Sequence, residues 1–203
     1  MPMTYQPESS PIPYHHGDLR AACVQAGIDL VEKGGPDAVT IRGVARLAGV
    51  SHQAPLHHFR DRDALVHEIA ERGFVMLVDR LDREMPAEAG PTVALRTYGL
   101  IYVSQAVEHP GLFQLMFAPC DEPTGEAAYR CLVDLCATAQ VSGELAGDDP
   151  LRLAMLLWGL VHGVAALYTS FGLEVGLSGQ PKDPHVAAEH ALDDLLGALH
   201  ANV

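Results

Sequence analysis

The chain has 203 residues, of which 48% are hydrophobic and 19% charged, enough to bury a substantial core and to exclude general disorder. Thirteen lysines and arginines against 26 acidic residues give a net charge of −13, which on average disfavours a nucleic-acid partner. Four prolines and no apolar run occupy the first sixteen residues, so no cleavable signal peptide is expected. Four irregularly spaced cysteines do not make a disulfide framework and fit a reducing cytoplasm.

Apolar residues recur at three- and four-residue spacing along most of the chain, which is the pattern of helices with one buried face. Capping hydroxyls and carboxylates stand before these segments, and glycines or prolines follow them. The nine expected helices cover 19–33, 41–48, 52–59, 61–85, 92–108, 112–118, 125–145, 151–171 and 185–200. We therefore predict an all-α fold, with a tri-helical head on a larger helical bundle.

The second and third expected helices have the pattern of a helix-turn-helix, joined by residues 48–51. Gly49 lies at the turn, where glycine adopts a positive φ without steric cost. Ser51 is expected to cap the next helix with its hydroxyl, and Pro55 falls in the first turn, where a missing N–H costs little. The alternative is a plain helical hairpin packed inside a core.

Charge is distributed unevenly along the chain. Residues 86–203 carry four cations and fourteen acids, whereas no acid lies between Ala38 and Arg60. This interval contains a basic stripe of three arginines and three histidines, namely Arg42, Arg46, His52, His57, His58 and Arg60. A local stripe of this kind indicates a phosphate-facing element better than the overall charge does. An ordinary solvated surface is the alternative interpretation.

The third expected helix would offer six side chains to solvent or to base edges: His52, Gln53, Ala54, Leu56, His57 and His58. Glutamine can pair with adenine, and alanine or leucine can contact a thymine methyl group. These residue types favour sequence-specific contact with double-stranded DNA.

The segment 151–171 is the most apolar in the chain and requires a test for membrane insertion. His162 lies at its centre, Arg152 near its start, and the flanks are acidic without a positive cluster on either side. We therefore expect a helix of a soluble protein with no membrane partner, buried on all sides and in part by a second subunit.

Three segments, 14–20, 40–51 and 56–65, closely resemble the TetR family of transcriptional regulators. Residues 158–163, Trp-Gly-Leu-Val-His-Gly, resemble the Trp…His-Gly signature of one ligand-binding domain type in that family. The resemblance implies a homodimeric repressor that releases a palindromic operator when a small-molecule effector binds. It also implies a flexible arm over 1–13, a DNA-binding domain over 14–60, and a ligand-binding and dimerisation domain over 61–203, with helix 61–85 connecting the two.

Two positions depart from the family pattern. Many members have glycine where this chain has Gln53, and a phosphate-binding tyrosine where it has Leu56. Leucine cannot bind a phosphate, so the resemblance shifts backbone contacts to Thr40, Arg42 and Arg62, with Ser51 at the helix start. Gln53 is then expected to add base discrimination.

A repressor of this type needs a largely apolar effector pocket that reaches the connecting helix. The candidate lining residues are Phe74, Leu77, Tyr98, Tyr102, Phe113, Met116, Phe117, Tyr129, Trp158 and His162. Each could instead be ordinary core, and His162 could be a core histidine bonded to a tyrosine or to a carbonyl rather than a donor or acceptor for the effector. Cys131 and Cys136 are five residues apart and cannot converge on one metal ion, so no metal or cofactor is expected.

Dimerisation is expected through the last two helices, because each has more apolar residues than one core face needs. The residues concerned are Leu160, Val161, Val164, Leu167, Ala188, Ala191, Leu192, Leu195 and Leu199. The rival interpretations are a small helical enzyme or a ligand-binding protein without a DNA role. The sequence has no Gly-rich phosphate loop, nucleophile elbow or HExxH motif, which disfavours an enzyme.

Overall fold

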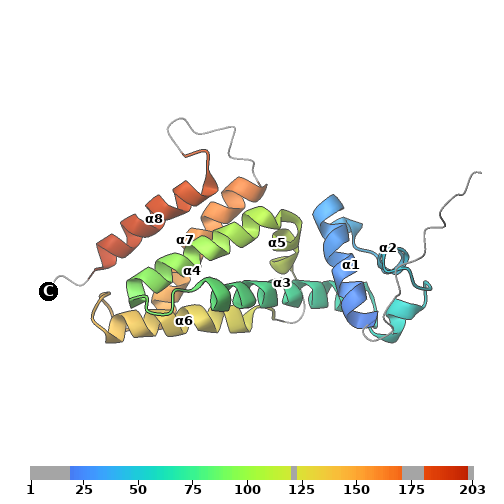
Figure 1. Cartoon of the computed structure of the whole chain (residues 1–203), viewed down its shortest axis with the longest axis horizontal. Helices are drawn as coiled ribbons and strands as arrows, with labels where there is room; N and C mark the ends of the chain where they lie inside the picture. Colours follow the sequence, from blue (N-terminus) through green and yellow to red (C-terminus); the bar gives the residue numbers. More distant parts are fainter. Residues whose placement is uncertain (1–18, 120–122, 171–180, 201–203) are drawn as a thin grey trace, which may run out of the picture.

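The computed structural model describes residues 19–119, 123–170 and 181–200, which contain eight α-helices, two short 3₁₀ helices and no extended strand. In chain order these are α1 (Leu19–Gly34), η1 (Pro36–Ala38), α2 (Ile41–Leu47), η2 (Ala54–His57), α3 (Arg62–Glu84), α4 (Pro91–Glu108), α5 (Pro110–Met116), α6 (Glu126–Val141), α7 (Pro150–Ser170) and α8 (Pro184–Leu199). A small head holding α1 and α2 lies at one end of the molecule, and a larger bundle lies at the other (Figure 1). The predicted all-α class is confirmed.

The head is built on a compact turn between α2 and η2. Thr40 caps α2, because its hydroxyl oxygen accepts a hydrogen bond from Gly43 N at 3.0 Å. At the other end Gly49 adopts φ 71°, and Val50 N donates to Ala45 O at 3.0 Å in a left-handed helix stop. The glycine turn expected from the sequence is therefore confirmed.

The third expected helix, 52–59, is wrong in kind and length, because the structure has only the one-turn η2 there. Pro55 has no N–H, so the bond to Ser51 O that would start an α-helix cannot form. Ala54 N donates to that oxygen instead, at 3.0 Å. The expected hydroxyl cap from Ser51 is also wrong, since η2 starts without any side-chain cap and Ser51 contributes its main-chain carbonyl.

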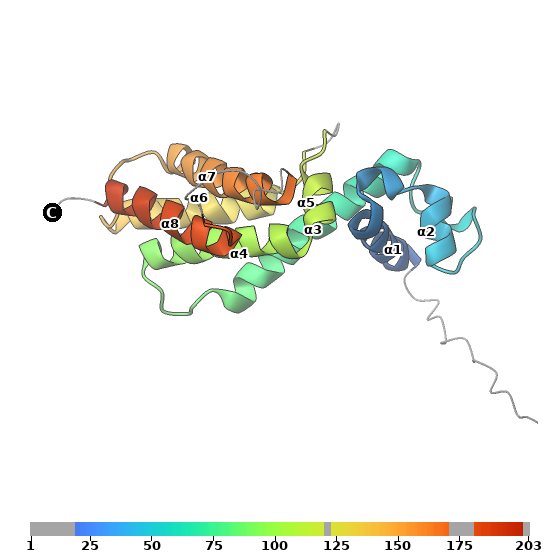
Figure 2. The ribbon, with the colours of Figure 1, turned by 90° about the horizontal axis from the view of Figure 1, so that it is seen from above.

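The connecting helix α3 belongs to both halves of the molecule. Asp61 caps its start by accepting from Ala64 N at 2.9 Å, as expected. Its first turns pack against α1, and its later turns pack against α4, α5 and α6 (Figure 2). Leu65 and Ile69 are buried on the head side and Leu77 and Leu81 on the bundle side, so one continuous core links the two.

Helix α4 runs through the centre of the bundle and contacts α6, α7 and α8. Gly99 allows the closest approach, because a β-carbon there would lie 2.7 Å from Leu192 of α8 and 3.0 Å from Val161 of α7. Polar contacts tie the start of α4 to its neighbours: Arg96 binds Asp193 of α8 at 2.7 Å, and Glu144, just after α6, accepts from the main chain and hydroxyl of Thr92.

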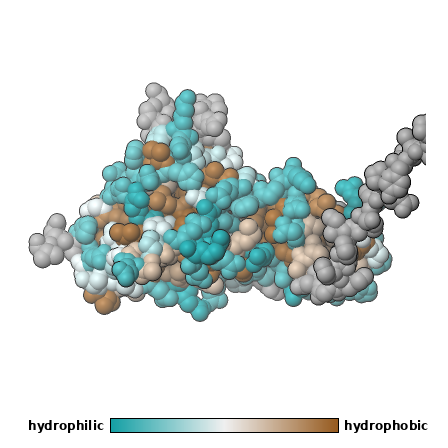
Figure 3. Space-filling view, viewed as in Figure 1, coloured by the Kyte–Doolittle hydropathy of each residue, from teal (hydrophilic) through white to brown (hydrophobic). Residues whose placement is uncertain are grey.

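Helix α7 is the one described helix long and apolar enough to cross a membrane, judged by length and composition alone. In the structure its inner side packs into the bundle through Leu153, Leu157 and Val161. Its outer side remains apolar and uncovered, with Met155 54% and Leu156 50% exposed. Elsewhere, on the face seen in Figure 3, hydrophobic and hydrophilic residues are interspersed over the head and the bundle.

Candidate functional site

The first candidate site is the outer surface of the head, formed by the start of α2 and the segment around η2. Nine of the ten sequence-predicted residues are exposed there: Thr40, Arg42, Ser51, His52, Gln53, Leu56, His57, His58 and Arg62. Ala54 is half-buried, because the backbone of η2 turns it toward the head. Phe59 and Pro55 are buried and anchor this surface on the head core.

Arginines make this surface basic, and they differ in how far they are already engaged. Arg42 and Arg46 are exposed and form no ion pair within the described ranges. Arg60 pairs with Asp61 at 2.7 Å. The guanidinium of Arg62 donates to the main-chain carbonyls of Val39 and Pro36 at 2.8 and 2.9 Å, and so holds the loop before α2.

The second candidate site is an aromatic cluster in the bundle. Seven of the ten residues expected around the effector share ring contacts there: Phe74, Tyr102, Phe113, Phe117, Tyr129, Trp158 and His162. Phe117 lies at the centre, with its ring centroid 4.6 Å from His162 and 5.4 Å from Phe74. The cluster therefore joins α3, α4, α5, α6 and α7.

A hydrogen-bonded chain crosses this cluster between α4 and α7. Trp158 Nε1 donates to the hydroxyl of Tyr102 at 3.2 Å, and that hydroxyl lies 2.8 Å from His162 Nδ1. Burial lowers the pKa of His162, so its neutral form is favoured, and burial also raises the pKa of Tyr102. Tyr102 is buried, whereas Trp158 and His162 are half-buried.

The other three expected effector residues lie in the core outside the ring cluster. Leu77 is fully buried on α3, and Met116 packs over Gly73, where a β-carbon would lie 2.6 Å from its sulfur. Tyr98 donates from its hydroxyl to Ala128 O at 3.0 Å, which ties α4 to α6.

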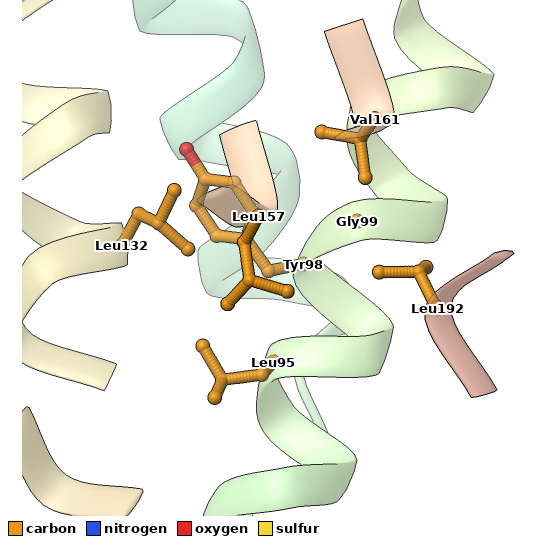
Figure 4. Close-up of a pocket in the computed structure, with 7 residues that line it drawn as sticks. All are labelled: Leu95, Tyr98, Gly99, Leu132, Leu157, Val161 and Leu192. Carbon is orange, nitrogen blue, oxygen red and sulfur yellow. The ribbon is translucent and has the colours of Figure 1, made fainter. Parts of the chain in front are cut away.

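Next to the cluster is a narrow apolar void that is too tight for a water molecule. Figure 4 shows its lining side chains converging from α4, α6, α7 and α8: Leu95, Tyr98, Gly99, Leu132, Leu157, Val161 and Leu192. Only Tyr98 of this set was expected from the sequence. Since the rings pack against one another beside this void, any molecule that entered the cluster would have to displace side chains.

The cysteines of the described residues are free thiols. Burial raises the pKa of Cys23 and Cys131 above the ordinary range and that of Cys136 to about 12. Such thiols are poorly nucleophilic at neutral pH. Within the described ranges no three histidine, cysteine or acidic side chains are placed to hold a metal ion.

Two family models match the chain in consecutive segments. Residues 24–69 match the model described as bacterial regulatory proteins, tetR family. Residues 95–195 match a tetracyclin repressor-like C-terminal domain. The chain belongs to the tetR family. The first match covers η2 and the basic stripe, and the second covers most of the aromatic cluster.

Similar proteins agree with this assignment. An HTH-type transcriptional repressor of Mycobacterium tuberculosis is 32% identical over 77 residues, which are 38% of this chain and 41% of the relative. The chain therefore matches only about two fifths of the length of these curated relatives. A solved protein of unknown function from Rhodococcus is 34% identical, with a TM-score of 0.78 over 93% of this chain and 98% of that one. A TetR regulator from Streptomyces coelicolor shares the fold at 22% identity, with a TM-score of 0.55 over 91% of this chain and 99% of that one.

A junction that the sequence did not indicate joins the two sites of this tetR-family chain. Glu32, near the end of α1, accepts hydrogen bonds from Gly111 N at 3.3 Å and Leu112 N at 3.1 Å in the first turn of α5. His109 Nδ1 lies 3.8 Å from the same carboxylate. Because α5 also carries Phe113 of the aromatic cluster, the head contacts the element on which the cluster is built. These partners are about eighty residues apart, and no local pattern could have shown the contact.

Proposed function

We propose that this chain is a homodimeric transcription regulator that binds a palindromic DNA operator through its head and releases it when a small molecule enters the aromatic cluster. The observation that carries the proposal is the exposed surface around η2, which is built mainly from an interval without acidic residues, 38–60, and lies within the segment matched to the tetR family. Such a surface supplies phosphate contacts from Thr40 and Arg42 and base contacts from Gln53. The proposal places this DNA binding in the cytoplasm.

Specific DNA binding is tested by an electrophoretic shift assay with the DNA upstream of the chain's own gene and a random fragment of equal length. We expect a shift at nanomolar protein on the first fragment, and affinity at least a thousandfold weaker on the second, of the order typical for specific binding. Equal affinity for both fragments, or no shift at 50 mM salt, contradicts the proposal.

Two variants distinguish contacts to DNA phosphates from contacts to base edges. Arg42→Ala should weaken binding to every sequence and reduce the slope of log affinity against log salt by about one. Gln53→Ala should cost about 1–3 kcal/mol on the best site only and relax the preference at one base pair. Arg130→Ala removes the same charge as Arg42→Ala from the exposed face of α6, and should leave both properties unchanged.

The dimer is proposed to form on the outer face of α7 together with part of α8. Four exposed apolar side chains support it on α7: Leu151, Met155, Leu156 and Leu167. A β-carbon at Gly159 or Gly163 would meet nothing within 4 Å, so a second helix can approach closely there. Three residues expected in this interface, Val161, Ala188 and Leu192, are buried in the core of one chain, and their assignment to the interface was wrong.

Sedimentation tests the interface with two variants that make the same chemical change. Leu156→Glu places a charge on the proposed contact and should give monomers at micromolar concentration. Val141→Glu, at a side chain 89% exposed on α6, should remain dimeric. If both variants are dimeric, the interface lies elsewhere. Paired half-sites require two heads held roughly 34–36 Å apart. If the unsubstituted chain is monomeric, it has only one head and the paired geometry is excluded.

Release is proposed to pass through α3 and α5. An effector that displaces Phe117 disturbs Phe74 of α3, which its ring contacts, and α5, whose first turn is bound by Glu32 of the head. To convert a 99:1 population of the DNA-binding form into 1:99, the effector must bind the released form about 10⁴-fold more tightly.

A further inference from the structure

The hydrogen-bonded chain across the aromatic cluster has a fixed direction. An indole N–H can only donate, so the Trp158 hydrogen points at the oxygen of Tyr102. Tyr102 is buried, and its hydroxyl has one other partner among the described residues, His162 Nδ1 at 2.8 Å. The single hydroxyl hydrogen can form a bond only if it points at that nitrogen. Buried polar hydrogens are rarely left unbonded, so the hydroxyl donates to His162 Nδ1.

This direction determines the tautomer of His162. If Nδ1 accepts the Tyr102 hydrogen, the proton of the neutral ring is on Nε2. A protonated ring would carry hydrogens on both nitrogens, and Nδ1 could then no longer accept. The burial that lowers the pKa of His162 works in the same direction.

The Nε2–H of His162 is an unused donor. No described residue accepts a hydrogen bond from it, and it is absent from the fully enclosed polar atoms that lack a partner. The described residues therefore neither bond this nitrogen nor enclose it completely. Aromatic rings surround it: the ring centroids of Phe117, Phe113 and Trp158 lie 4.6, 5.3 and 6.0 Å from that of His162.

Charge further limits what can bind here. A cationic group such as an ammonium has no lone pair with which to accept the Nε2–H bond. An anion is repelled by the acidic bundle, in which residues 86–203 carry fourteen acids and four cations. Two of those cations are already engaged, Arg96 by Asp193 and Glu189, and Arg130 by Glu126. No described arginine or lysine forms a contact with the cluster to neutralise a carboxylate.

We propose that the effector is an uncharged, predominantly apolar or aromatic molecule with a carbonyl-type oxygen that accepts a hydrogen bond from His162 Nε2. This rests on the proposed function, in which the aromatic cluster is the effector site. Trp158 and Tyr102 are positioning residues: they hold the imidazole so that it presents a donor. The rings of Phe113 and Phe117 supply the flat apolar contact.

The first test is the tautomer itself, measured by long-range ¹⁵N–¹H NMR of the histidine rings, with the His162 signals assigned by their loss in His162→Phe. We expect the Nε2–H form at pH 7.5, and a mixture of tautomers in Tyr102→Phe, where the hydroxyl is missing. A ring protonated on Nδ1 overturns the proposal without reference to any ligand.

The second test uses two probe pairs of equal shape in calorimetry: acetophenone with α-methylstyrene, and butyrophenone with 2-phenyl-1-pentene. Each pair differs only in C=O against C=CH₂. The wild type should bind the ketone of at least one pair five- to tenfold more tightly, as one hydrogen bond allows. His162→Phe should reduce the difference to less than twofold, and benzoate should bind more weakly than acetophenone.

His190→Phe is the matched control, because His190 is exposed on α8, outside the cluster, and should keep the ketone preference. Equal affinity for the members of both pairs, or no binding of any probe up to its solubility, overturns the proposal. Neither test involves DNA, so they can fail while the operator shift persists. The reverse result, ketone preference without an operator shift, would refute the proposed function alone.

Discussion

The contact between the head and the bundle is close enough that one methyl group should disrupt it. A β-carbon at Gly111, in the first turn of α5, would lie 2.4 Å from the carbonyl oxygen of Val31 and 3.0 Å from Cα of Glu32. Ordinary carbon contacts begin near 3.5 Å, so Gly111→Ala must push α1 and α5 apart by about 1 Å. The obstructing atoms are main chain, and no side-chain rotation can relieve them.

The cost combines strain with weakened hydrogen bonds. Overpacking of this kind costs about 1–3 kcal/mol, and the two bonds that Glu32 accepts at 3.1 and 3.3 Å weaken as the helices part. We expect Gly111→Ala to lower the free energy of unfolding by about 2–4 kcal/mol. For a chain of this length that is a fall in Tm of about 5–15 °C.

The assay is denaturant unfolding followed by circular dichroism, with Gly197→Ala as the control. A β-carbon at Gly197 of α8 meets nothing within 4 Å, so the same substitution should be neutral or raise stability by up to about 1 kcal/mol through helix propensity. If the free energy of unfolding of Gly111→Ala stays within about 0.5 kcal/mol of the wild-type value, α1 and α5 do not pack this closely in solution. The proposed coupling between the aromatic cluster and the head through α5 would then be wrong.

Three further outcomes are expected. Thr40→Ala removes the cap of α2 and should lower the free energy of unfolding by about 1 kcal/mol in urea titration, whereas Thr40→Ser should retain most of it. Arg62→Lys cannot bind both carbonyls of the loop before α2 and should lower the free energy of unfolding by about 1 kcal/mol in the same titration. An unchanged free energy of unfolding would disprove this structural role. His162 binds a proton less readily in the folded than in the unfolded chain, so its contribution to stability is present above pH 6.5 or so and is lost as pH falls through the lowered folded pKa. Between pH 7.5 and 5 the wild type should therefore lose more stability than His162→Phe, and equal losses would show that His162 titrates normally.

Local chemistry in the sequence was sufficient to predict the parts of the fold that depend on neighbouring residues. Thr40 and Asp61 cap their helices because a cap needs only a side-chain oxygen three residues before a free amide. Gly49 takes a positive φ for an equally local reason. Pro55 was placed correctly in a first turn, but its missing N–H removes the bond that distinguishes an α-helix from a 3₁₀ turn in so short a segment.

Contacts between distant segments could not be predicted in the same way. The aromatic residues were recognisable as a set, yet the spacing of Leu157, Val161 and Leu192 does not show that they surround a void. Helices α7 and α8 are apolar on more than one side, so their periodicity could not separate the core face of Val161 from the outer face of Leu156. Only the packing around α4 distinguishes those faces.

Trp158 is the only tryptophan in the chain, and it lies half-buried in the aromatic cluster, away from the head. The molecule therefore carries an optical reporter of this one location, and no label is needed. Its emission should respond when Phe117 or Tyr129 moves against the indole ring and should not change with substitutions on the outer surface of the head. The proposed binding of an effector and of an operator can thus be followed in one sample, the first by intrinsic emission and the second by a dye on the DNA.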